Sequence, residues 1–296
     1  MKIASGRELL HTSAGSTRVL DPTDLDLAAA RRATYVLDQA VSYAYPAPAH
    51  NLHQQLIVVP PARHHDQERS ADRFRVVAST PSESRRRTDR FGNTVLHVRA
   101  ARVDDHISFD MRAVLERGAV VEPGRWSSRF GGTTVRTTAD EALQDASADL
   151  ARQVRGLDLI DAIGNHVHTS MRYVKGVTDV TTTAAQAWQG RAGVCQDMAH
   201  VMVVLCRLNG LAARYVSGHL VGEGASHAWV EVQADQGARH QVVAFDPTHD
   251  RRTDLRYLTV AVGRDYADVA PTSGTCESAR RGELTITKTL SIATLE

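Results

Sequence analysis

The sequence 193-GVCQDMAH-200 opens an apolar stretch that continues to Leu208. Apolar residues fall on nearly every side of a helix drawn through this stretch, so the helix has no face left for water and is expected to be buried. Glycines at both ends of residues 190–193 break the preceding segment, and Asn209-Gly210 supplies a pair able to end a helix in left-handed dihedrals. Cys195 is therefore expected at the first helical turn. There the unpaired N–H groups and the positive end of the helix dipole favour a thiolate, which makes Cys195 a candidate nucleophile.

The composition is that of an ordinary soluble globular protein. The chain has 296 residues, 42% of them apolar, and a net charge of +1 from 35 basic and 34 acidic residues. This length accommodates one large or two ordinary domains, and the balanced charge gives no global field for nucleic acid or membrane. No apolar run approaches a membrane span, and residues 1–20 lack the apolar centre of a secretory signal. Three widely spaced cysteines do not form a disulfide framework, so a cytoplasmic location is expected.

The N-terminal part of the chain has the pattern of an all-β domain. Residues 1–24 are polar and aperiodic, and we expect a loosely held arm there. Between residues 25 and 118, short β-prone segments recur about every ten residues, and Asp89-Arg90-Phe91-Gly92-Asn93 is a hairpin signal. This pattern predicts a β-rich, sandwich-like domain over 25–118. The stretch from Gly118 to Gly132 contains four glycines and Pro123, and residues 119–136 read as a linker.

The spacing of apolar residues along the sequence changes after the linker, and a catalytic core is predicted over 137–270. Three helices are expected before the buried one, with an N-cap at Thr138 in the first; they cover residues 138–154, 158–171 and 181–189. After Gly210 the period is two, which predicts an antiparallel meander of three strands over 213–220, 226–232 and 241–245. Further strands are expected at 257–262 and 283–292, the latter within a C-terminal strand segment over 271–296. The fold class is therefore α+β, a buried helix packed on an antiparallel sheet.

Two residues of the meander can complete a nucleophilic site. His227 begins one predicted strand and Asp246 ends the next. Adjacent antiparallel strands can place such positions side by side, with Cys195 packed across from both. A carboxylate on one imidazole nitrogen would fix the tautomer and leave the other nitrogen to take the thiol proton. The pattern predicts a Cys-His-Asp triad for acyl transfer.

Four motifs in this order resemble the transglutaminase-like superfamily in its bacterial form. They are 193-GVCQDMAH-200, 214-RYVSGHL-220, 226-SHAWVEV-232 and 245-FDPTHD-250, and 261-AVGRDYADVAPTSG-274 is also similar to that family. The resemblance covers residues 25–293 and includes the β-rich region that often precedes the core. It implies a papain-like α+β core with Cys195 as nucleophile, His227 as base and Asp246 as orienting acid.

The resemblance further implies a thioester formed from an amide, often that of a glutamine, in a protein or peptide substrate. The acyl group then passes to water, as in a protease or amidase, or to an amine, as in a transglutaminase, and we favour water. Cys276 departs from the family, which has an aromatic residue there. No EF-hand pattern is present, so the calcium dependence of animal transglutaminases is not carried over. We expect no cofactor and no nucleic-acid or membrane partner, and no residue indicates the oligomeric state.

Other residues have weaker predicted roles. Trp188, Gln196 and Asp197 are predicted to contact substrate, although Asp197 is also suited to complement the helix N-terminus. His200 and Cys206 are expected in the core, and Cys276 is expected to be inert. We expect Trp229 to point away from His227. Only the backbone N–H of Cys195 is a candidate oxyanion donor.

Two alternatives stay open. Zinc held by Cys195, His200, His227 and Asp246 is disfavoured because no Cys-x-x-Cys or His-Glu-x-x-His spacing is present. A catalytically silent protein-binding module on the same fold is the second alternative, with the β-rich domain as its binding element. The complete triad argues against it, and an unreactive Cys195 would argue for it.

Overall fold

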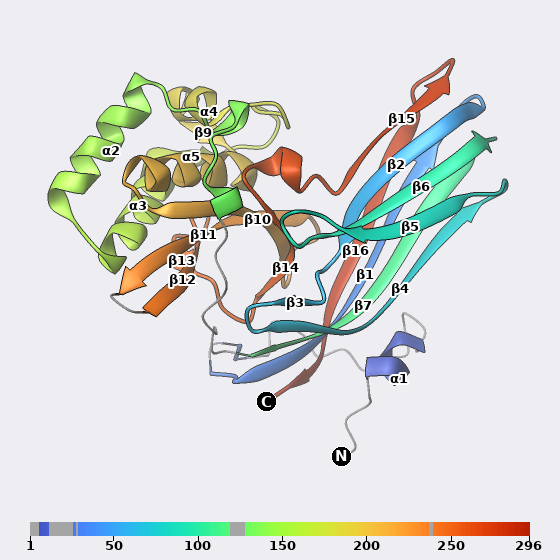
Figure 1. Ribbon diagram of the computed structural model, residues 1–296, viewed down its shortest axis with the longest axis horizontal. Helices are drawn as coiled ribbons and strands as arrows, with labels where there is room; N and C mark the ends of the chain where they lie inside the picture. Colours follow the sequence, from blue (N-terminus) through green and yellow to red (C-terminus); the bar gives the residue numbers. More distant parts are fainter. Residues whose placement is uncertain (1–5, 12–25, 28, 119–127, 237–238) are drawn as a thin grey trace. The chain divides into compact units, whose positions relative to one another are not determined.

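The computed structural model describes residues 6–11, 26–27, 29–118, 128–236 and 239–296. The chain divides into two compact units (Figure 1). The β unit comprises Met1–Val120, Leu220–Ala225 and Ala270–Glu296, and the α+β unit comprises Val121–His219 and Ser226–Val269. Most of the arm predicted over 1–24 lies outside the described residues, apart from the short helix α1 (Gly6–His11). The predicted linker is described only from Ser128 onward.

The β unit is built from two antiparallel sheets. One has the strand order β16-β1-β7-β4-β3 and the other β15-β2-β6-β5, and β2 packs against β7. Its strands are β1 (Arg32–Ala44), β2 (Ala49–Val59), β3 (Arg63–His64), β4 (Gln67–Ala78), β5 (Glu83–Thr88), β6 (Thr94–Val103), β7 (His106–Gly118), β15 (Thr272–Ser278) and β16 (Glu283–Leu295). Alternate residues of β1, such as Tyr35, Leu37 and Val41, are buried, as expected when one face of a sheet covers a core.

The C-terminal strands complete both sheets. β16 pairs antiparallel with β1, with Val41 opposite Ile286, and β15 pairs with β2, with Gln54 opposite Gly274. Sequence analysis predicted the strand at β16 but not the one at β15, whose residues are mostly exposed and show no apolar alternation. Residues 271–296, which follow the predicted core, therefore belong to the β unit.

The α+β unit combines a helical cluster with an antiparallel sheet of its own, of order β13-β12-β11-β10-β14 (Figure 1). Its helices are η2 (Ser128–Phe130), η3 (Val135–Thr137), α2 (Glu141–Gln153), α3 (Leu157–Ser170), α4 (Ala184–Gly190), α5 (Cys195–Leu208) and η4 (Tyr266–Asp268). Its strands are β8 (Arg172–Tyr173), β9 (Ala192–Gly193), β10 (Ala212–Leu220), β11 (Ser226–Gln236), β12 (Arg239–Asp246), β13 (Arg251–Arg252) and β14 (Tyr257–Gly263). The α5 helix packs against β11, α3 and α4, so the predicted buried helix on an antiparallel sheet is confirmed. In the described part of the chain, no helix combines the length and apolar character needed to span a bilayer.

Two helix starts differ from the prediction because side chains two residues later provide the caps. The α2 helix is capped by Asp140, which accepts from the N–H of Leu143, whereas Thr138 ends the preceding η3. The α4 helix is capped by Thr183, which accepts from the N–H of Gln186. The N-cap prediction at Thr138 is wrong by two residues, since Asp140 is equally suited to the position and lies next to the first helical residue.

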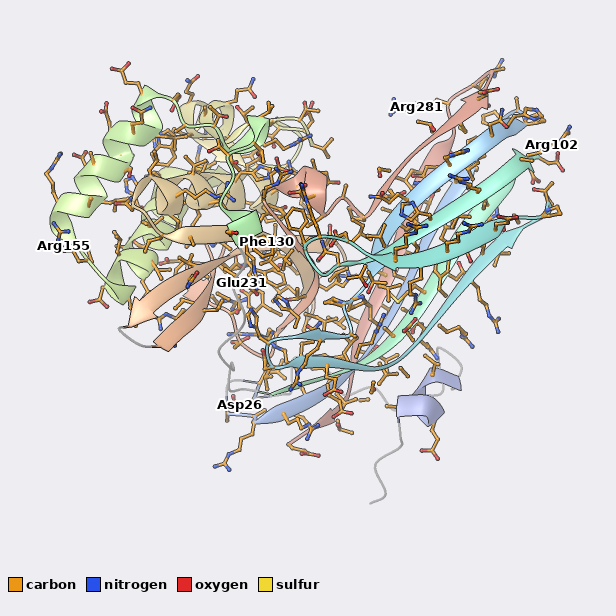
Figure 2. The ribbon with its side chains drawn as sticks, viewed as in Figure 1. Asp26, Arg102, Phe130, Arg155, Glu231 and Arg281 are labelled. Atoms are coloured by element: carbon orange, nitrogen blue, oxygen red, sulfur yellow. The ribbon has the colours of Figure 1, made fainter. Side chains whose placement is uncertain are left out.

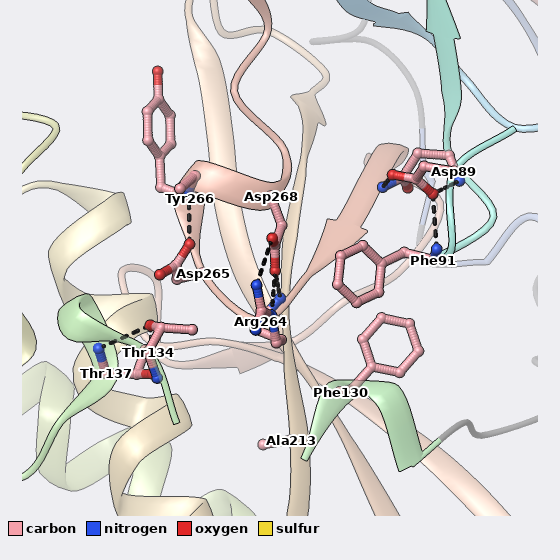
Figure 3. Close-up of polar contacts among 12 residues, drawn as sticks. Asp89, Phe91, Phe130, Thr134, Thr137, Ala213, Arg264, Asp265, Tyr266 and Asp268 are labelled. Carbon is pink, nitrogen blue, oxygen red and sulfur yellow. Dashed lines mark hydrogen bonds and ion pairs between the residues drawn. The ribbon is translucent and has the colours of Figure 1, made fainter. Parts of the chain in front are cut away.

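Buried polar contacts hold the α+β unit together. The guanidinium of Arg207 at the end of α5 donates to the carbonyls of Phe130 and Ala213, and burial lowers its pKa to about 10. Nearby, Asp265 caps η4 and Arg264 pairs with Asp268 (Figure 3). A second buried pair joins Arg214 of β10 to Glu231 of β11, and Glu231 is labelled in Figure 2. These bonds satisfy charges that would be costly to bury alone.

Gly218 allows the closest approach in the central sheet. A Cβ at this position would lie 2.1 Å from the backbone oxygen of Leu258 and 2.4 Å from the ring of Trp229. Gly218→Ala is expected to lower the free energy of unfolding in urea by about 2 to 3 kcal/mol, because a backbone atom cannot give way as a flexible side chain does. A Cβ added at Gly190 would have no atom within 4 Å. Gly190→Ala is the matched control, with an expected change within about 0.5 kcal/mol. Equal unfolding energies for the two variants would contradict this account.

Candidate active site

Cys195 is the first residue of α5, as predicted. The hydrogen-bond ladder of the helix begins with the N–H groups of Asp197 and Met198, both of which donate to the carbonyl of Val194. The N–H groups of Cys195 and Gln196 precede that ladder, so they are available to a negatively charged atom at the helix end. Cys195 is half-buried and is not in a disulfide. The thiol at the helix start is therefore partly accessible to solvent.

Asp197 closes the turn that presents Cys195. Its Oδ2 accepts from the N–H of Val194 at 2.8 Å and from the hydroxyl of Thr178 at 2.7 Å. Gly193 makes this possible, since a Cβ there would lie 2.6 Å from the same oxygen. Asp197 is almost completely buried, and burial raises the pKa of its carboxyl. The contacts give Asp197 a role in fixing the helix start, and its predicted contact with substrate stays a prediction.

His227 joins the thiol to Asp246. Its Nε2 lies 2.7 Å from Oδ2 of Asp246, and it also makes a side-chain hydrogen bond with Cys195. Because Nε2 faces the carboxylate and donates to it, Nδ1 is left for the sulfur. The register of β11 and β12 places these residues as the sequence indicates, with Val230 opposite Phe245. The structure brings the three predicted triad residues together.

Asp246 accepts more hydrogen bonds than a triad requires. Besides His227, its Oδ2 accepts from Nδ1 of His249 at 2.7 Å and from the hydroxyl of Tyr257 at 2.8 Å. Its Oδ1 accepts from the N–H of Thr248 at 2.8 Å. Each donor favours the charged form of a carboxylate that is fully buried. The carboxylate is thus fixed in both position and charge.

The electrostatics favour an ion pair between His227 and Asp246. Burial alone would lower the pKa of His227, but its hydrogen bonds to Asp246 and Cys195 outweigh burial and raise the pKa to about 10. Burial would raise the pKa of Asp246, yet the hydrogen bonds it accepts, first that from His227, hold the pKa well below its usual range. At neutral pH the pair is therefore imidazolium and carboxylate.

Sequence analysis missed His249 and Tyr257. His249 lies three residues after Asp246, in the turn that follows β12, and is within the quoted FDPTHD motif, which was the one available signal. Tyr257 begins β14, and its hydroxyl also accepts from Nε of Arg251 at 2.8 Å. β14 lies beside β10, at the opposite edge of the sheet from β13, so no spacing in the sequence indicates that its first residue reaches Asp246.

Comparisons with known proteins place this part of the chain in a family and support its fold. Residues 140–247 match the sequence model of the transglutaminase-like superfamily. This part of the chain is a transglutaminase-like domain. A solved structure from Cytophaga hutchinsonii, provisionally described as a cysteine protease, superposes with a TM-score of 0.72 at 20% identity, covering 88% of this chain and 91% of that one. That similarity establishes the fold of both the transglutaminase-like core and the N-terminal sheet region.

Mycobacterial proteins share part of the sequence. Uncharacterized proteins of Mycobacterium tuberculosis and Mycobacterium bovis are 37% identical over 130 residues, which is 40% of this chain and 41% of theirs. One from Mycobacterium leprae is 39% identical over 123 residues, 38% of this chain and 42% of that protein. The chain thus matches less than half the length of these relatives.

Trp229 of the transglutaminase-like domain does not point away from His227. The two rings lie side by side, 6.4 Å between centroids, and Trp229 meets the ring of Tyr257 edge-on at 5.4 Å. The prediction is wrong because residues two apart on a strand share a face. Trp229 is buried and contributes a wall against which the imidazole is held.

The remaining predicted residues of the domain lie at different depths. Trp188 is buried, with the guanidinium of Arg191 3.9 Å from its ring centroid, and its indole nitrogen has no partner among the described residues. Gln196 is half-buried and donates to the carbonyl of Asp179 at 3.3 Å. The substrate contacts predicted for Trp188 and Gln196 stay predictions.

His200 and Cys206 of α5 are core residues, as expected. His200 is completely buried, and its Nε2 accepts from the N–H of Tyr266 at 3.1 Å. Burial lowers its pKa to about 3, so it is neutral at physiological pH. Burial also raises the pKa of the Cys206 thiol to about 12, which makes this thiol unreactive compared with an exposed one. Among the described residues, neither side chain forms a hydrogen bond with the predicted triad.

Within the α+β unit, one group of described residues has the spacing of metal ligands. The ligand atoms of His227, Asp246 and His249 lie within 4.8 Å of one another. These atoms already share hydrogen bonds, because Oδ2 of Asp246 accepts from Nε2 of His227 and from Nδ1 of His249, both at 2.7 Å. The hydrogen bonds already made by these atoms fit proton chemistry better than metal binding.

The raised pKa of His227 predicts a pH dependence of stability. A histidine whose folded-state pKa lies above its unfolded value of 6.5 stabilises the fold fully below pH 6.5, and this contribution is lost as the pH rises through about 10. The difference in unfolding free energy between wild type and His227→Gln, measured in urea, is therefore expected to shrink between these values. A difference that grows with pH would contradict the ion pair.

Proposed function

We propose that this protein is a cysteine-dependent enzyme that acts on amide bonds of a protein or peptide through a thioester acyl-enzyme. The observation that carries the proposal is the continuous set of hydrogen bonds from Cys195 through His227 to Asp246. Such an arrangement activates a nucleophile and holds its base in one tautomer. The cytoplasmic location expected from the sequence is part of this proposal.

The first half of the reaction forms the thioester. The sulfur of Cys195 attacks the amide carbonyl carbon while the carbonyl oxygen takes the negative charge, near the N–H of Cys195. His227 gives the proton on Nδ1 to the departing amine, and the C–N bond breaks as the C–S bond remains. Asp246 keeps the imidazole oriented throughout through its bond to Nε2.

The second half releases the acyl group. The now neutral Nδ1 of His227 takes a proton from water or from an amine, which attacks the thioester carbonyl. Cleavage of the C–S bond regenerates the thiolate–imidazolium pair. Attack by water gives hydrolysis or deamidation, and attack by an amine gives a cross-link. The half-buried position of Cys195 allows either acceptor to approach.

Trapping the acyl-enzyme tests the proposal. The wild-type protein is incubated with a mixture of glutamine-containing peptides, and intact mass spectrometry is expected to detect an acyl adduct on Cys195. Adding a primary amine such as monodansylcadaverine then separates the two acceptors, because only transfer gives a dansylated peptide. Loss of ammonia or peptide cleavage without dansylation identifies a hydrolase.

Iodoacetamide labelling distinguishes an enzyme from a silent binding module. Cys195 is expected to be alkylated faster than the exposed Cys276, and His227→Ala is expected to remove this advantage. A Cys195 that reacts no faster than Cys276, together with no acyl adduct, would overturn the enzymatic proposal and favour the binding module.

A further inference from the structure

The outer face of the β15-β2-β6-β5 sheet carries a cluster of basic side chains around a cavity of about 320 Å³. The lining residues are Glu83, Arg85 and Arg87 of β5 and His97 and Arg99 of β6. We refer to these five residues as the basic cavity. All of them belong to the β unit, and none is part of the candidate active site.

The strand register explains why these side chains gather on one face. Arg85 lies opposite His97, and Glu83 lies opposite Arg99. Alternate residues of each strand share a face, so Arg87 joins them. The residues between them on β6 point to the opposite face, into the β unit. Leu96, for example, is buried. The basic cavity is therefore displayed by two paired strands rather than by loops.

The positive charge of the cavity is not neutralised within the described protein. Arg86, on the opposite face of β5, pairs with Asp72, and the buried Arg112 and Arg117 also have carboxylate partners. By contrast, Arg85, Arg87 and Arg99 make no ion pair with any described residue, although Glu83 is among the lining residues. Like charges held close together on a sheet are destabilising, so this arrangement lowers the stability of the β unit.

Protection of the sheet edge accounts for only part of the cluster. β5 is the last strand of its sheet, and charged residues on edge strands discourage aggregation. This explains Arg85 and Arg87. It does not explain Arg99 and His97, which lie on β6, inside the sheet. A cluster that extends across two strands is better matched to an anionic partner, since guanidinium groups bind carboxylates bidentately.

The free edge of β5 indicates the form of that partner. All six residues of Glu83–Thr88 are exposed, and β6 is the one neighbour of β5 in the sheet order of the described strands. An extended peptide can add to such an edge by backbone hydrogen bonds, with alternate side chains on one face. Side chains at that spacing would lie beside Arg85 and Arg87, and long ones would reach toward Arg99.

We propose that the β unit binds an extended acidic peptide segment, which adds as a strand to β5 and places carboxylates at alternate positions in the basic cavity. This binding requires no turnover and does not rest on the proposed enzymatic function.

Fluorescence anisotropy with the full-length protein tests the proposal. The probe is a labelled peptide of about nine residues with glutamate and threonine alternating, long enough to span β5. The double variant Arg85→Gln/Arg87→Gln is expected to weaken binding at least about tenfold, and added sodium chloride is expected to weaken binding to the wild type. Arg73→Gln/Arg75→Gln is the matched control, because it removes the same charge at the same spacing from β4 and is expected to bind as wild type does.

Two further probes separate strand addition from simple charge attraction. The same peptide with N-methylated backbone amides keeps every carboxylate but loses backbone donors, and it is expected to bind much more weakly. Pyrophosphate and a short single-stranded RNA are competitors. Absence of peptide binding, equal affinity of the N-methylated peptide, equal loss in the two double variants, or tighter binding of pyrophosphate or RNA than of the peptide would each overturn the proposal.

Discussion

Replacing Cys195 by alanine is expected to lower turnover of an amide substrate by at least about 10⁴-fold while leaving the fold intact. The thiol supplies the bonding atom of the acyl-enzyme, so no other group compensates for its loss. The side chain is only half-buried, so its removal leaves a small void at the helix start. The measurement is kcat on a substrate identified by acyl-enzyme trapping, together with the thermal midpoint of unfolding.

The other two cysteines are the controls for this experiment. Cys276→Ala changes an exposed thiol, and its turnover is expected to equal that of wild type. Cys206→Ala removes a sulfur from the core of α5 and is expected to lower stability rather than the chemistry of the folded protein. Retained turnover in Cys195→Ala would show that the observed activity does not use this triad.

Replacing Asp246 by alanine is expected to have the largest effect on stability. The substitution leaves His227, His249, the hydroxyl of Tyr257 and the N–H of Thr248 without their shared acceptor. Removal of one partner from a buried ion pair costs about 3 to 5 kcal/mol, because the remaining charge is left buried and unpaired. The free energy of unfolding in urea at neutral pH measures this loss.

Asp246→Asn separates charge from shape at the same position. The amide keeps the volume and one acceptor oxygen, so the loss of stability is expected to be smaller than in Asp246→Ala. Turnover is still expected to fall by about 10⁴-fold, since an amide no longer selects the tautomer that leaves Nδ1 facing the sulfur. Similar unfolding energies for wild type and Asp246→Ala would contradict the role assigned to this carboxylate.

The sequence was sufficient for the parts of the site that depend on local pattern. The apolar stretch after Cys195 predicts a buried helix, and its first residue is the thiol that the structure places at the helix start. The period-two segments predict adjacent strands whose ends bring His227 to Asp246. Both inferences rest on periodicity and on the pairing of neighbouring strands, which are set by the chain itself.

Contacts between elements that are distant in the chain were not predicted. Tyr257 reaches Asp246 from β14, and the order of that sheet cannot be inferred from strand spacing. The pairing of β16 with β1 and of β15 with β2 also depends on tertiary folding. The mistaken direction of Trp229 had a different origin: the strand period was known but was misapplied to residues two apart.

The pairing of β16 with β1 has a consequence for synthesis on the ribosome. The hydroxyls of Thr34 and Thr294 bond across 260 residues of chain. The first sheet of the β unit therefore lacks one edge strand until β16 (Glu283–Leu295) has been translated. By then, Val121–His219 and Ser226–Val269 have already been translated, so the α+β unit can begin to fold while the earlier-made strands of the β unit still lack their partner. Nascent β1 is exposed along one side for that interval, which makes its apolar residues a natural target for a chaperone.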